Sequence, residues 1–277
     1  MRRHVSNRDR PCCRLPDAFL GTPVQQAAVL TMLLATLVCV DISVAAENFA
    51  ETRARAERGD AAAQFNLGSM YYRGQGVAEN LTEAYTWFHK AAEQGNALAQ
   101  HYLGRMYYTG GGVTMDHGEA VKWWRKAAEQ GYPDAQWQLG SSYASGDGVA
   151  KDQQEAVRWF RKAAEQGNAE AMDSLAGAYE SGEGVTKDWT ESFKWLRMAA
   201  EHGLIRIRFA VALAYEDGEV VPKDEIEALA WYNLAAASGN ELAIKFRNRL
   251  EHRLGRQTTL IAQRRSKEIL AKIESNQ

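Results

Sequence analysis

The sequence predicts an all-α fold in which helix–turn–helix units stack into an α-solenoid. The strongest observation is a motif that begins with tryptophan and ends in glycine. It occupies residues 87–95 and returns, in close or looser copies, at residues 123–131, 159–167, 195–203 and 231–239. The spacing is 36 residues throughout, without insertion or deletion. A fixed period of about 20 to 50 residues is typical of stacked repeats, in which each unit occupies the same space as its neighbours.

Each unit is predicted to contain two helices joined by a glycine loop. In the first unit Ala63, Leu67 and Tyr71 lie at helical spacing, which indicates a first helix over residues 61–72. Residues 74–77 then read Gly-Gln-Gly-Val. Glycine ends the helix and turns the chain because it adopts positive φ without a steric cost. A second helix is expected to begin at Asn80 and to end at residue 95.

The start of every second helix carries an N-capping pattern, in which an Asn or Asp is followed three residues later by Glu. The predicted N-cap residues are Asn80, Asp116, Asp152, Asp188 and Asp224. In such a capping box the first side chain accepts a hydrogen bond from a free backbone N–H, and the Glu reaches back to the N–H of the cap residue. Capping explains the spacing fully. We therefore interpret these residues as structural and not as five pairs of catalytic carboxylates.

One tryptophan per unit forms a second structural column. Its members are Trp87, Trp123, Trp159, Trp195 and Trp231. With Ala84, Phe88 and Ala91, Trp87 lies on an apolar stripe of helical period, so we expect this column to pack in the core.

The first helices contain an internal glycine in three units, at positions 68, 104 and 140. Glycine inside a helix costs about 1 kcal/mol relative to alanine. A position that tolerates this cost is expected to face a bulky partner, such as the column tryptophan.

These features resemble the Sel1-like repeats, which are relatives of the tetratricopeptide repeats. The resemblance rests on Ala-Gln-x-x-Leu-Gly in the first helix, Gly-x-Gly-Val in the loop and Trp-aromatic-x-Lys-Ala-Ala-Glu-Gln-Gly in the second helix. A tyrosine also recurs at positions 71, 107, 143, 179 and 215. The resemblance covers about residues 59–239. It implies a right-handed α-solenoid that binds proteins or peptides, often as an adaptor, with its first helices lining a concave surface.

The repeat pattern divides the chain into segments. Residues 47–59 look like the second helix of a degenerate unit, which would cap the array, and residues 240–277 are expected to form a partial sixth repeat and a C-terminal capping helix. The five full units are residues 60–95, 96–131, 132–167, 168–203 and 204–239. In the fifth unit Ile207 replaces an alanine and Val220 replaces the second loop glycine, so we expect a rebuilt turn. Gly255 is expected to break the last helical segment.

The first 46 residues have the pattern of a secretory signal peptide. Basic residues as far as Arg14 precede an apolar run at residues 27–40, and Ser43, Ala45 and Ala46 are small. We expect cleavage after Ala45 or Ala46, and hence a periplasmic protein. The alternative is an uncleaved inner-membrane anchor, although a span needs about 20 apolar residues. All three cysteines lie in this segment, so the mature chain would contain no disulfide.

The composition favours neither an enzyme nor a nucleic-acid binder. Acidic and basic residues nearly balance, at 35 and 33, whereas nucleic-acid binders are usually basic. The histidines lack metal-ligand spacing, and the Gly-x-Gly loops do not follow a strand, as a dinucleotide site requires. We therefore expect no catalysis, metal or cofactor. The basic segment 240–277 could touch nucleic acid or anionic lipid, but we favour a solvated capping face, because a charge run without a nucleic-acid motif is usually solvated, and we expect no nucleic-acid partner.

The predicted partner-binding site is the side of the first helices opposite Leu67 and Tyr71. This side is aromatic in the first three units and mixed in the later ones. The candidate residues are Phe65, Tyr72, His101, Tyr102, Tyr108 and Trp137. Exposed clusters of large aromatic residues are typical of interaction sites. The sequence leaves open the alternative that Phe65 and Tyr72 only pack between units.

The leading hypothesis is a non-enzymatic adaptor of the bacterial cell envelope that binds a protein or peptide in a concave groove. A second hypothesis is a binder or weak β-lactamase-like hydrolase of cell-wall-related compounds, which some cysteine-rich relatives suggest. Those relatives carry a disulfide in each unit, and this chain lacks the cysteines. A third is the same scaffold held at the membrane by an uncleaved leader.

Overall fold

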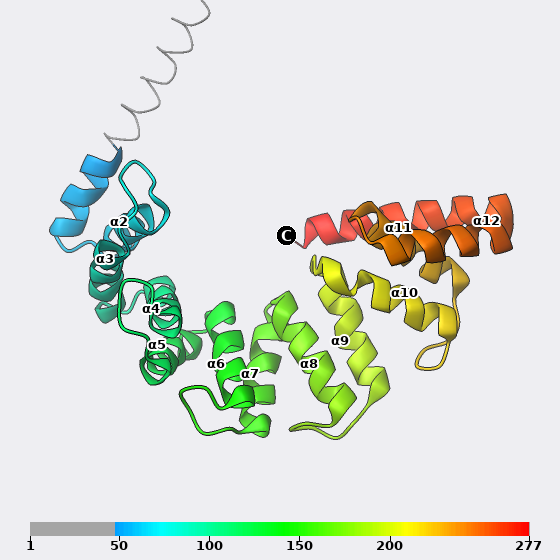
Figure 1. Cartoon of the computed structure of the whole chain (residues 1–277), viewed down its shortest axis with the longest axis horizontal. Coiled ribbons are helices and arrows are strands. Elements are labelled where there is room, and N and C mark those ends of the chain that lie inside the picture. Colours follow the sequence, from blue (N-terminus) through cyan, green and yellow to red (C-terminus); the bar gives the residue numbers. More distant parts are fainter. Residues whose placement is uncertain (1–47, 277) are drawn as a thin grey trace, which may run out of the picture.

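The computed structural model describes residues 48–276, which form an α-solenoid that bends into an open arc (Figure 1). The expected signal peptide lies outside the described residues. A first helix covers residues 48–57. The elements that follow are α2 (Ala61–Arg73), α3 (Leu81–Glu93), α4 (Ala97–Thr109), α5 (His117–Glu129), α6 (Pro133–Ser145), α7 (Gln153–Glu165), α8 (Ala169–Ser181), α9 (Trp189–Glu201), the 3₁₀ helix η1 (Ile205–Ile207), α10 (Arg208–Asp217), α11 (Glu225–Ala237) and α12 (Glu241–Ser275). From α2 to α11, the even-numbered helices are the first helices of the units and the odd-numbered helices are the second.

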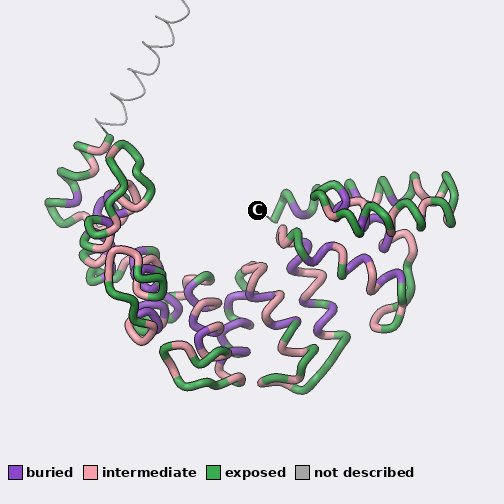
Figure 2. The backbone as a smooth tube through the Cα atoms, viewed as in Figure 1, coloured by how far each residue is buried: buried purple, intermediate pink, exposed green. Residues whose placement is uncertain are grey.

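Buried residues run between the helices along the whole arc and do not gather in one central core (Figure 2). Three separate clusters lie in the first half of the array, and one large cluster extends from α7 to the end of α12. Each unit is therefore stabilised mainly by its neighbours in sequence, as expected for a quasi-one-dimensional array.

The tryptophan column packs in these clusters and joins consecutive units. Four of its members are 7–9% exposed, and Trp231 is fully buried. Trp123 of α5 belongs to a cluster otherwise formed by the preceding helices, with Ala84 of α3 and Leu103 of α4. The ammonium group of Lys126 lies 3.9 Å from the centroid of the Trp123 ring, which is a cation–π contact. The column tryptophan of one unit thus packs against the helices of the unit before it.

The glycines inside the first helices face the residue after the column tryptophan, and not the tryptophan itself as expected. A Cβ added at Gly68 would lie 2.7 Å from the ring of Phe88, and one at Gly104 would collide with the ring of Trp124. Both rings are buried. The expectation was wrong because, one residue further along the second helix, the side chain turns from the neighbouring unit towards the first helix of its own unit.

The second helices begin with the expected N-cap residues, whose side chains accept hydrogen bonds from backbone N–H groups in the first turn. The second bond of the predicted capping box, in which the Glu side chain accepts from the N–H of the N-cap residue, does not form. The backbone N–H of Asn80 donates to the carbonyl oxygen of Tyr71 at 2.9 Å, and the same bond recurs in every later unit. The glutamate is free to pair elsewhere, as Glu119 does with Lys122 at 2.6 Å. The backbone carbonyl of the recurring tyrosine, near the end of the first helix, is therefore bonded to the start of the second helix and holds the two ends of the loop together.

The second glycine of the loop is required by a close approach between units. Gly148 has φ +72°, and a Cβ there would collide with the carbonyl group of His117 at the start of α5. In the fifth unit Val220 stands at this position, and Ile207 belongs to η1 rather than to a regular first helix. This unit therefore departs from the others on both sides of α10.

A glutamine relay, which the sequence analysis did not anticipate, crosses the first three units. The side-chain amide of Gln100 donates to the carbonyl oxygen of Ala92 at 3.1 Å, and its oxygen accepts from Gln130 Nε2 at 2.7 Å. Equivalent bonds are formed by Gln64, Gln94, Gln136 and Gln166. The relay satisfies buried polar groups that would otherwise be costly. It ends in the fourth unit, where Met172 stands at the position of Gln100.

The helix α12 closes the C-terminal end of the array. Gly255, with φ +77° and ψ 173°, interrupts it. Residues 241–254 continue the series of first helices, and residues 256–275 turn back along α11 (Figure 1). The returning part is held by an ion pair between Arg265 and Glu227 and by one between Lys272 and Glu201.

The outer positions of α11, which α12 covers, are apolar. Ala230 and Leu234 are buried, whereas the equivalent positions of α5 carry the exposed Lys122 and Lys126. A helix that is apolar around its whole circumference is a buried helix. The fifth unit has therefore lost the charged outer face of the other second helices because α12 occupies that face.

We predict that Gly104→Ala destabilises the array, although alanine is the better helix former. The new methyl group would collide with Trp124, and overpacking of this kind costs about 1–3 kcal/mol. This cost equals or exceeds the gain of about 1 kcal/mol that alanine brings through its higher helix propensity. Urea unfolding followed by circular dichroism measures the difference.

The matched control is Gly177→Ala in α8, because a Cβ there meets no atom within 4 Å. This substitution should leave the stability unchanged or raise it. If both variants unfolded at the same urea concentration, the close packing assigned to Gly104 would be contradicted.

Candidate partner-binding surface

The exposed side of the first helices forms the surface on which the predicted anchors lie. We call it the A surface and define it by positions 62, 65, 66, 69, 72 and 73 of the first unit and their equivalents in later units. In α2, Leu67 is fully buried against the second helix, Phe65 is half-buried and Asn66 is exposed. First helices of neighbouring units contact one another through these positions, so the surface continues from unit to unit.

Three of the predicted anchors pack together where α2 meets α4. The ring centroids of Phe65 and Tyr72 lie 5.8 Å and 5.7 Å from that of Tyr102, and Phe88 lies beneath all three at 5.1–6.2 Å. Arg73 donates a hydrogen bond to the Tyr102 hydroxyl at 3.3 Å. The packing between units that the sequence left open therefore exists for Phe65 and Tyr72. Partner binding at the part of these rings that stays accessible remains a prediction.

His101 is buried, which differs from the exposed anchor that the sequence analysis expected. Its side chain is 6% exposed, and the rings of Tyr102 and Tyr132 lie 5.8 Å and 5.1 Å away. Within the described residues its Nδ1 atom has no hydrogen-bond partner. Burial lowers the pKa of His101 to about 4, partly offset by the negative charge of Asp134. The residue is therefore neutral at pH 7 and belongs to the packing between units.

Tyr108 and Trp137 keep accessible surface. Tyr108 is 38% exposed, and its ring stacks on that of His117 with a centroid distance of 4.6 Å. Trp137 is half-buried, and its indole N–H donates to the Ser174 hydroxyl at 3.1 Å, which links α6 to α8. Both residues can contact a partner without leaving the fold.

A cavity of about 200 Å³ lies beside Tyr108, between α4 and α6. It results from a change in side-chain size along the A surface. In the second unit the side chains of Tyr102 and Met106 fill the corresponding space between α2 and α4. At the equivalent positions the third unit has Gln138 and Ser142, both of which line the cavity. The aromatic part of the A surface therefore ends at a polar depression.

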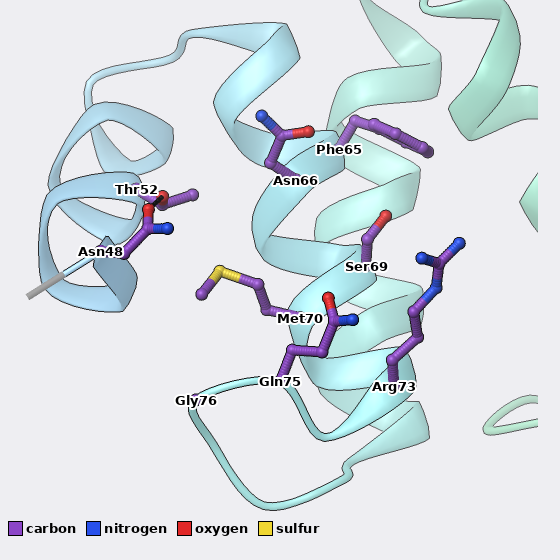
Figure 3. A pocket seen from close by; sticks show the side chains of 9 residues that line it. All are labelled: Asn48, Thr52, Phe65, Asn66, Ser69, Met70, Arg73, Gln75 and Gly76. Atoms are coloured by element: carbon purple, nitrogen blue, oxygen red, sulfur yellow. Dashed lines mark hydrogen bonds between the residues drawn. The ribbon is translucent and has the colours of Figure 1, made fainter. Parts of the chain in front are cut away.

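A larger cavity of about 440 Å³ lies between the helix at residues 48–57 and α2 (Figure 3). Asn48, Thr52, Phe65, Asn66, Ser69, Met70, Arg73, Gln75 and Gly76 line it. The equivalent face of α4 is covered by α2, and there Met106 is buried, whereas Met70 is only half-buried. Within the described residues no first helix precedes residues 48–57, so this face stays open. The sequence analysis did not predict this cavity. The residue that could have indicated it is Asn66, a small polar side chain at the position where the second unit has Tyr102.

Residues 48–276 contain neither a candidate metal site nor a candidate membrane span. No group of three or more histidine, cysteine and acidic side chains is arranged to hold a metal ion. No helix in the same residues combines the length and apolar character needed to cross a membrane.

Comparison with known proteins settles the family. The family model described as "Sel1 repeat" matches residues 61–96, 97–132, 133–168, 169–204 and 208–240. The chain belongs to the Sel1 repeat family. The fifth match begins at residue 208, where α10 begins after the irregular η1. Sel1 repeat proteins typically mediate protein interactions and are generally non-enzymatic scaffolds.

Two solved structures are similar over most of this chain. The first is c5321, a protective antigen of uropathogenic Escherichia coli strains with an SLR fold. It is 34% identical, with a TM-score of 0.70, and the match covers 82% of this chain but only 48% of that one. The second is a Sel1 repeat protein from Oxalobacter formigenes, 36% identical with a TM-score of 0.65, covering 76% of this chain and 88% of that one. A comparison with curated proteins finds no match.

Towards its C-terminal end, the A surface of this Sel1 protein becomes acidic. Arg206 of η1 binds Glu170 at 2.8 Å and Asp173 at 2.5 Å, both on α8. All three side chains are partly exposed, and such ion pairs contribute roughly 0–1 kcal/mol to stability. Their main effect is to set the charge pattern that a partner meets.

We predict that His101→Phe makes folding less sensitive to acid. Folded His101 titrates near pH 4, whereas an unfolded histidine titrates near pH 6.5. Between these values the unfolded state binds a proton that the folded state does not, so stability is complete above about pH 6.5 and is lost as the pH falls. At pH 5 the loss attributable to His101 is about 2 kcal/mol. Phenylalanine fits because Phe65 occupies the equivalent position.

Urea unfolding at pH 7 and pH 5 measures this difference for the wild type and the variant. His252→Phe, at an exposed histidine of α12, is the control and should keep the wild-type pH dependence. If His101→Phe lost as much stability as the wild type between the two pH values, the buried neutral histidine would be the wrong explanation.

Proposed function

We propose that this chain is a non-enzymatic adaptor that binds a protein or peptide partner along its A surface, in the concave groove that the family resemblance implies. The observation that supports the proposal is the contrast between constant buried positions and variable surface positions. The tryptophan column and the caps recur in every unit. At position 72 of the A surface, by contrast, tyrosine in two units gives way to Ala144 and then to Glu180 and Glu216.

This contrast suits a binding scaffold. The recurring contacts hold the first helices at fixed spacings, so the A surface is rigid before a partner arrives, which reduces the entropic cost of binding. Repeat solenoids use such extended surfaces for recognition. The accessible rings of Tyr108 and Trp137 are of the kind that interface hot spots favour.

We further propose that the adaptor acts in the bacterial cell envelope, after export to the periplasm. The basic, apolar and small-residue segments of residues 1–46 support this proposal. The mass of the protein recovered from cells tests it. Cleavage after Ala45 or Ala46 would support a periplasmic protein, and an intact leader in the membrane fraction would support the anchored alternative.

We predict that Tyr108→Ala combined with Trp137→Ala removes a partner that the wild type captures. The full chain serves as bait in cross-linked cells, and the retained proteins are quantified by mass spectrometry. A partner lost at least tenfold from the variant supports binding at the A surface, provided that the variant melts cooperatively.

The control variant carries Lys122→Ala and Arg158→Ala, two second-helix residues whose side chains are 68% and 72% exposed. It should retain the partner. Equal recovery of the partner by the A-surface variant would contradict the proposed location. Covalent labelling of the wild type by a fluorescent penicillin would support the hydrolase alternative instead.

A further inference from the structure

At two places where consecutive units meet, an aromatic ring of the later first helix packs against the earlier unit. We call each such place a joint. At the first joint the ring centroid of Tyr102 in α4 lies 5.7 Å from that of Tyr72 and 5.1 Å from that of Phe88. At the last joint Phe246 of α12 has the equivalent position, and its centroid lies 5.7 Å from that of Tyr232. A ring at this position is therefore the side chain with which the array itself fills the space between first helices.

The joint between the second and third units keeps the receiving surface and lacks the ring. Tyr108 and Trp124 stand at the positions of the two rings that receive Tyr102, and their centroids lie 5.4 Å apart. Gln138 stands at the position of Tyr102 itself. All three line the cavity of about 200 Å³ described above, which we call the Tyr108 cavity. It is smaller than the roughly 300–1,000 Å³ typical of small-molecule sites, so its size suits a single side chain.

The two joints that follow lack this receiving surface. At the joint between the third and fourth units, Ala144 stands at the position of Tyr108, and the Ser174 hydroxyl opposite it already accepts from the Trp137 indole at 3.1 Å. At the joint after that one, Glu180 stands at the position of Tyr108. Among the joints of residues 48–276, the one beside Tyr108 is therefore the place where two receiving rings face no ring of the next first helix.

The Tyr108 cavity also contains polar groups that can bond to a hydroxyl on such a ring. Ser141, Ser145 and Asp147 line it. The Asp147 carboxylate accepts from the Ser145 hydroxyl at 2.9 Å and has no ion-pair partner within residues 48–276. A carboxylate is a strong acceptor for an O–H group. The array already forms this bond elsewhere, because the Tyr232 hydroxyl donates to Glu216 at 2.7 Å. The lining therefore favours tyrosine over phenylalanine.

We propose that the Tyr108 cavity binds a tyrosine side chain of the partner protein. The bound ring packs against Tyr108 and Trp124 as Tyr102 packs against the rings of the first unit, at the centroid separations of about 4.5–7 Å that aromatic pairs prefer. Its hydroxyl donates to the Asp147 carboxylate. This inference rests on the proposed adaptor function and names the chemistry of its partner: a segment that presents a tyrosine to the second and third repeats.

The probe is the blocked peptide acetyl-Gly-Gly-Tyr-Gly-Gly-amide, titrated into the ¹⁵N-labelled full chain. The indole N–H of Trp124 and the backbone amides of Ser142 and Asp147 report binding by nuclear magnetic resonance. The expected result is saturable shifts of these signals, and the absence of such shifts would overturn the proposal.

Two further peptides identify the side chain that the cavity selects. The phenylalanine peptide should bind about tenfold more weakly than the tyrosine peptide, because it lacks the hydroxyl that bonds to a charged acceptor. The arginine peptide should produce no saturable shift. If it bound as tightly as the tyrosine peptide, the cavity would select a cation for the rings and Asp147, and the proposal would be wrong.

A filled variant tests the place of binding. Gln138→Tyr with Ser142→Met supplies from the chain itself the side chains of Tyr102 and Met106, which fill the corresponding space in the second unit. This variant should no longer bind the tyrosine peptide. It should also unfold at a higher urea concentration than the wild type, because filling a cavity stabilises a fold. Unchanged peptide binding by the folded variant would overturn the placement.

A second variant tests the hydroxyl contact without changing the packing of the helices. Asp147→Ala should raise the Kd of the tyrosine peptide to that of the phenylalanine peptide and leave the phenylalanine peptide unaffected. The matched control is Glu183→Ala, at the equivalent loop position of the next unit, which should bind both peptides as the wild type does. An unchanged preference for tyrosine in Asp147→Ala would contradict the proposed contact.

The same variants separate this inference from the adaptor proposal. A partner that needs Tyr108 and Trp137 but is retained by Gln138→Tyr with Ser142→Met, together with no shift by the tyrosine peptide, would leave the adaptor in place and remove the tyrosine site. Saturable binding of the tyrosine peptide at the Tyr108 cavity, with no partner captured by any form of the chain, would support the tyrosine site and contradict the adaptor.

Discussion

The contact between an aromatic ring of the second helix and a glycine of the first sets the geometry of the array. At Gly104 the absence of a side chain lets the first helix lie directly on Trp124, and the same contact forms between Gly68 and Phe88. Gly140 and Phe160 form the third such contact, so in the first three units a ring lies directly against the first helix. The fourth and fifth units have Ala176 and Ala212 at the position of the glycine. The column tryptophan, one residue earlier in the second helix, packs against the preceding unit. Adjacent residues of one helix thus contribute to the spacing within a unit and to the spacing between units, and the period of 36 residues continues without an insertion.

Polar groups are satisfied by an equally regular arrangement, and the places where it stops are informative. The glutamine relay links each first helix to two second helices until Met172 ends it. In the fifth unit Arg208 takes the position, donates to the Ser238 hydroxyl at 3.2 Å and leaves its Nε atom without a partner in the described chain. Burial lowers the pKa of this arginine. The irregular η1 and the acidic part of the A surface begin in the same region, so the scaffold and the surface change together.

The sequence was sufficient to predict the solenoid, its period and the N-caps, because these depend on spacing along one chain segment. The capping glutamates were misjudged, since the competing acceptor, the carbonyl of Tyr71, comes from a different helix. His101 was expected at the surface for a similar reason. A helical wheel shows which side of a helix faces away from its own partner, but not that Tyr132 of the next unit will cover that side. The cavity at the N-terminal end is also a property of two helices, and no pattern within one of them reveals it.

The two described ends of the array differ, and the difference bears on how the surface works. At the C-terminal end, α12 covers α11 and satisfies the acids of the fifth unit, so that end is closed by the chain itself. At the N-terminal end, the face of α2 that includes Met70 remains accessible beside residues 48–57. The C-terminal cover reaches as far as the fourth unit, because Lys272 of α12 binds Glu201 of α9. The ion pairs of this cover include no A-surface residue of the third or fourth unit, so positions such as those of Trp137 and Glu180 can differ from repeat to repeat while the helices beneath them stay in place.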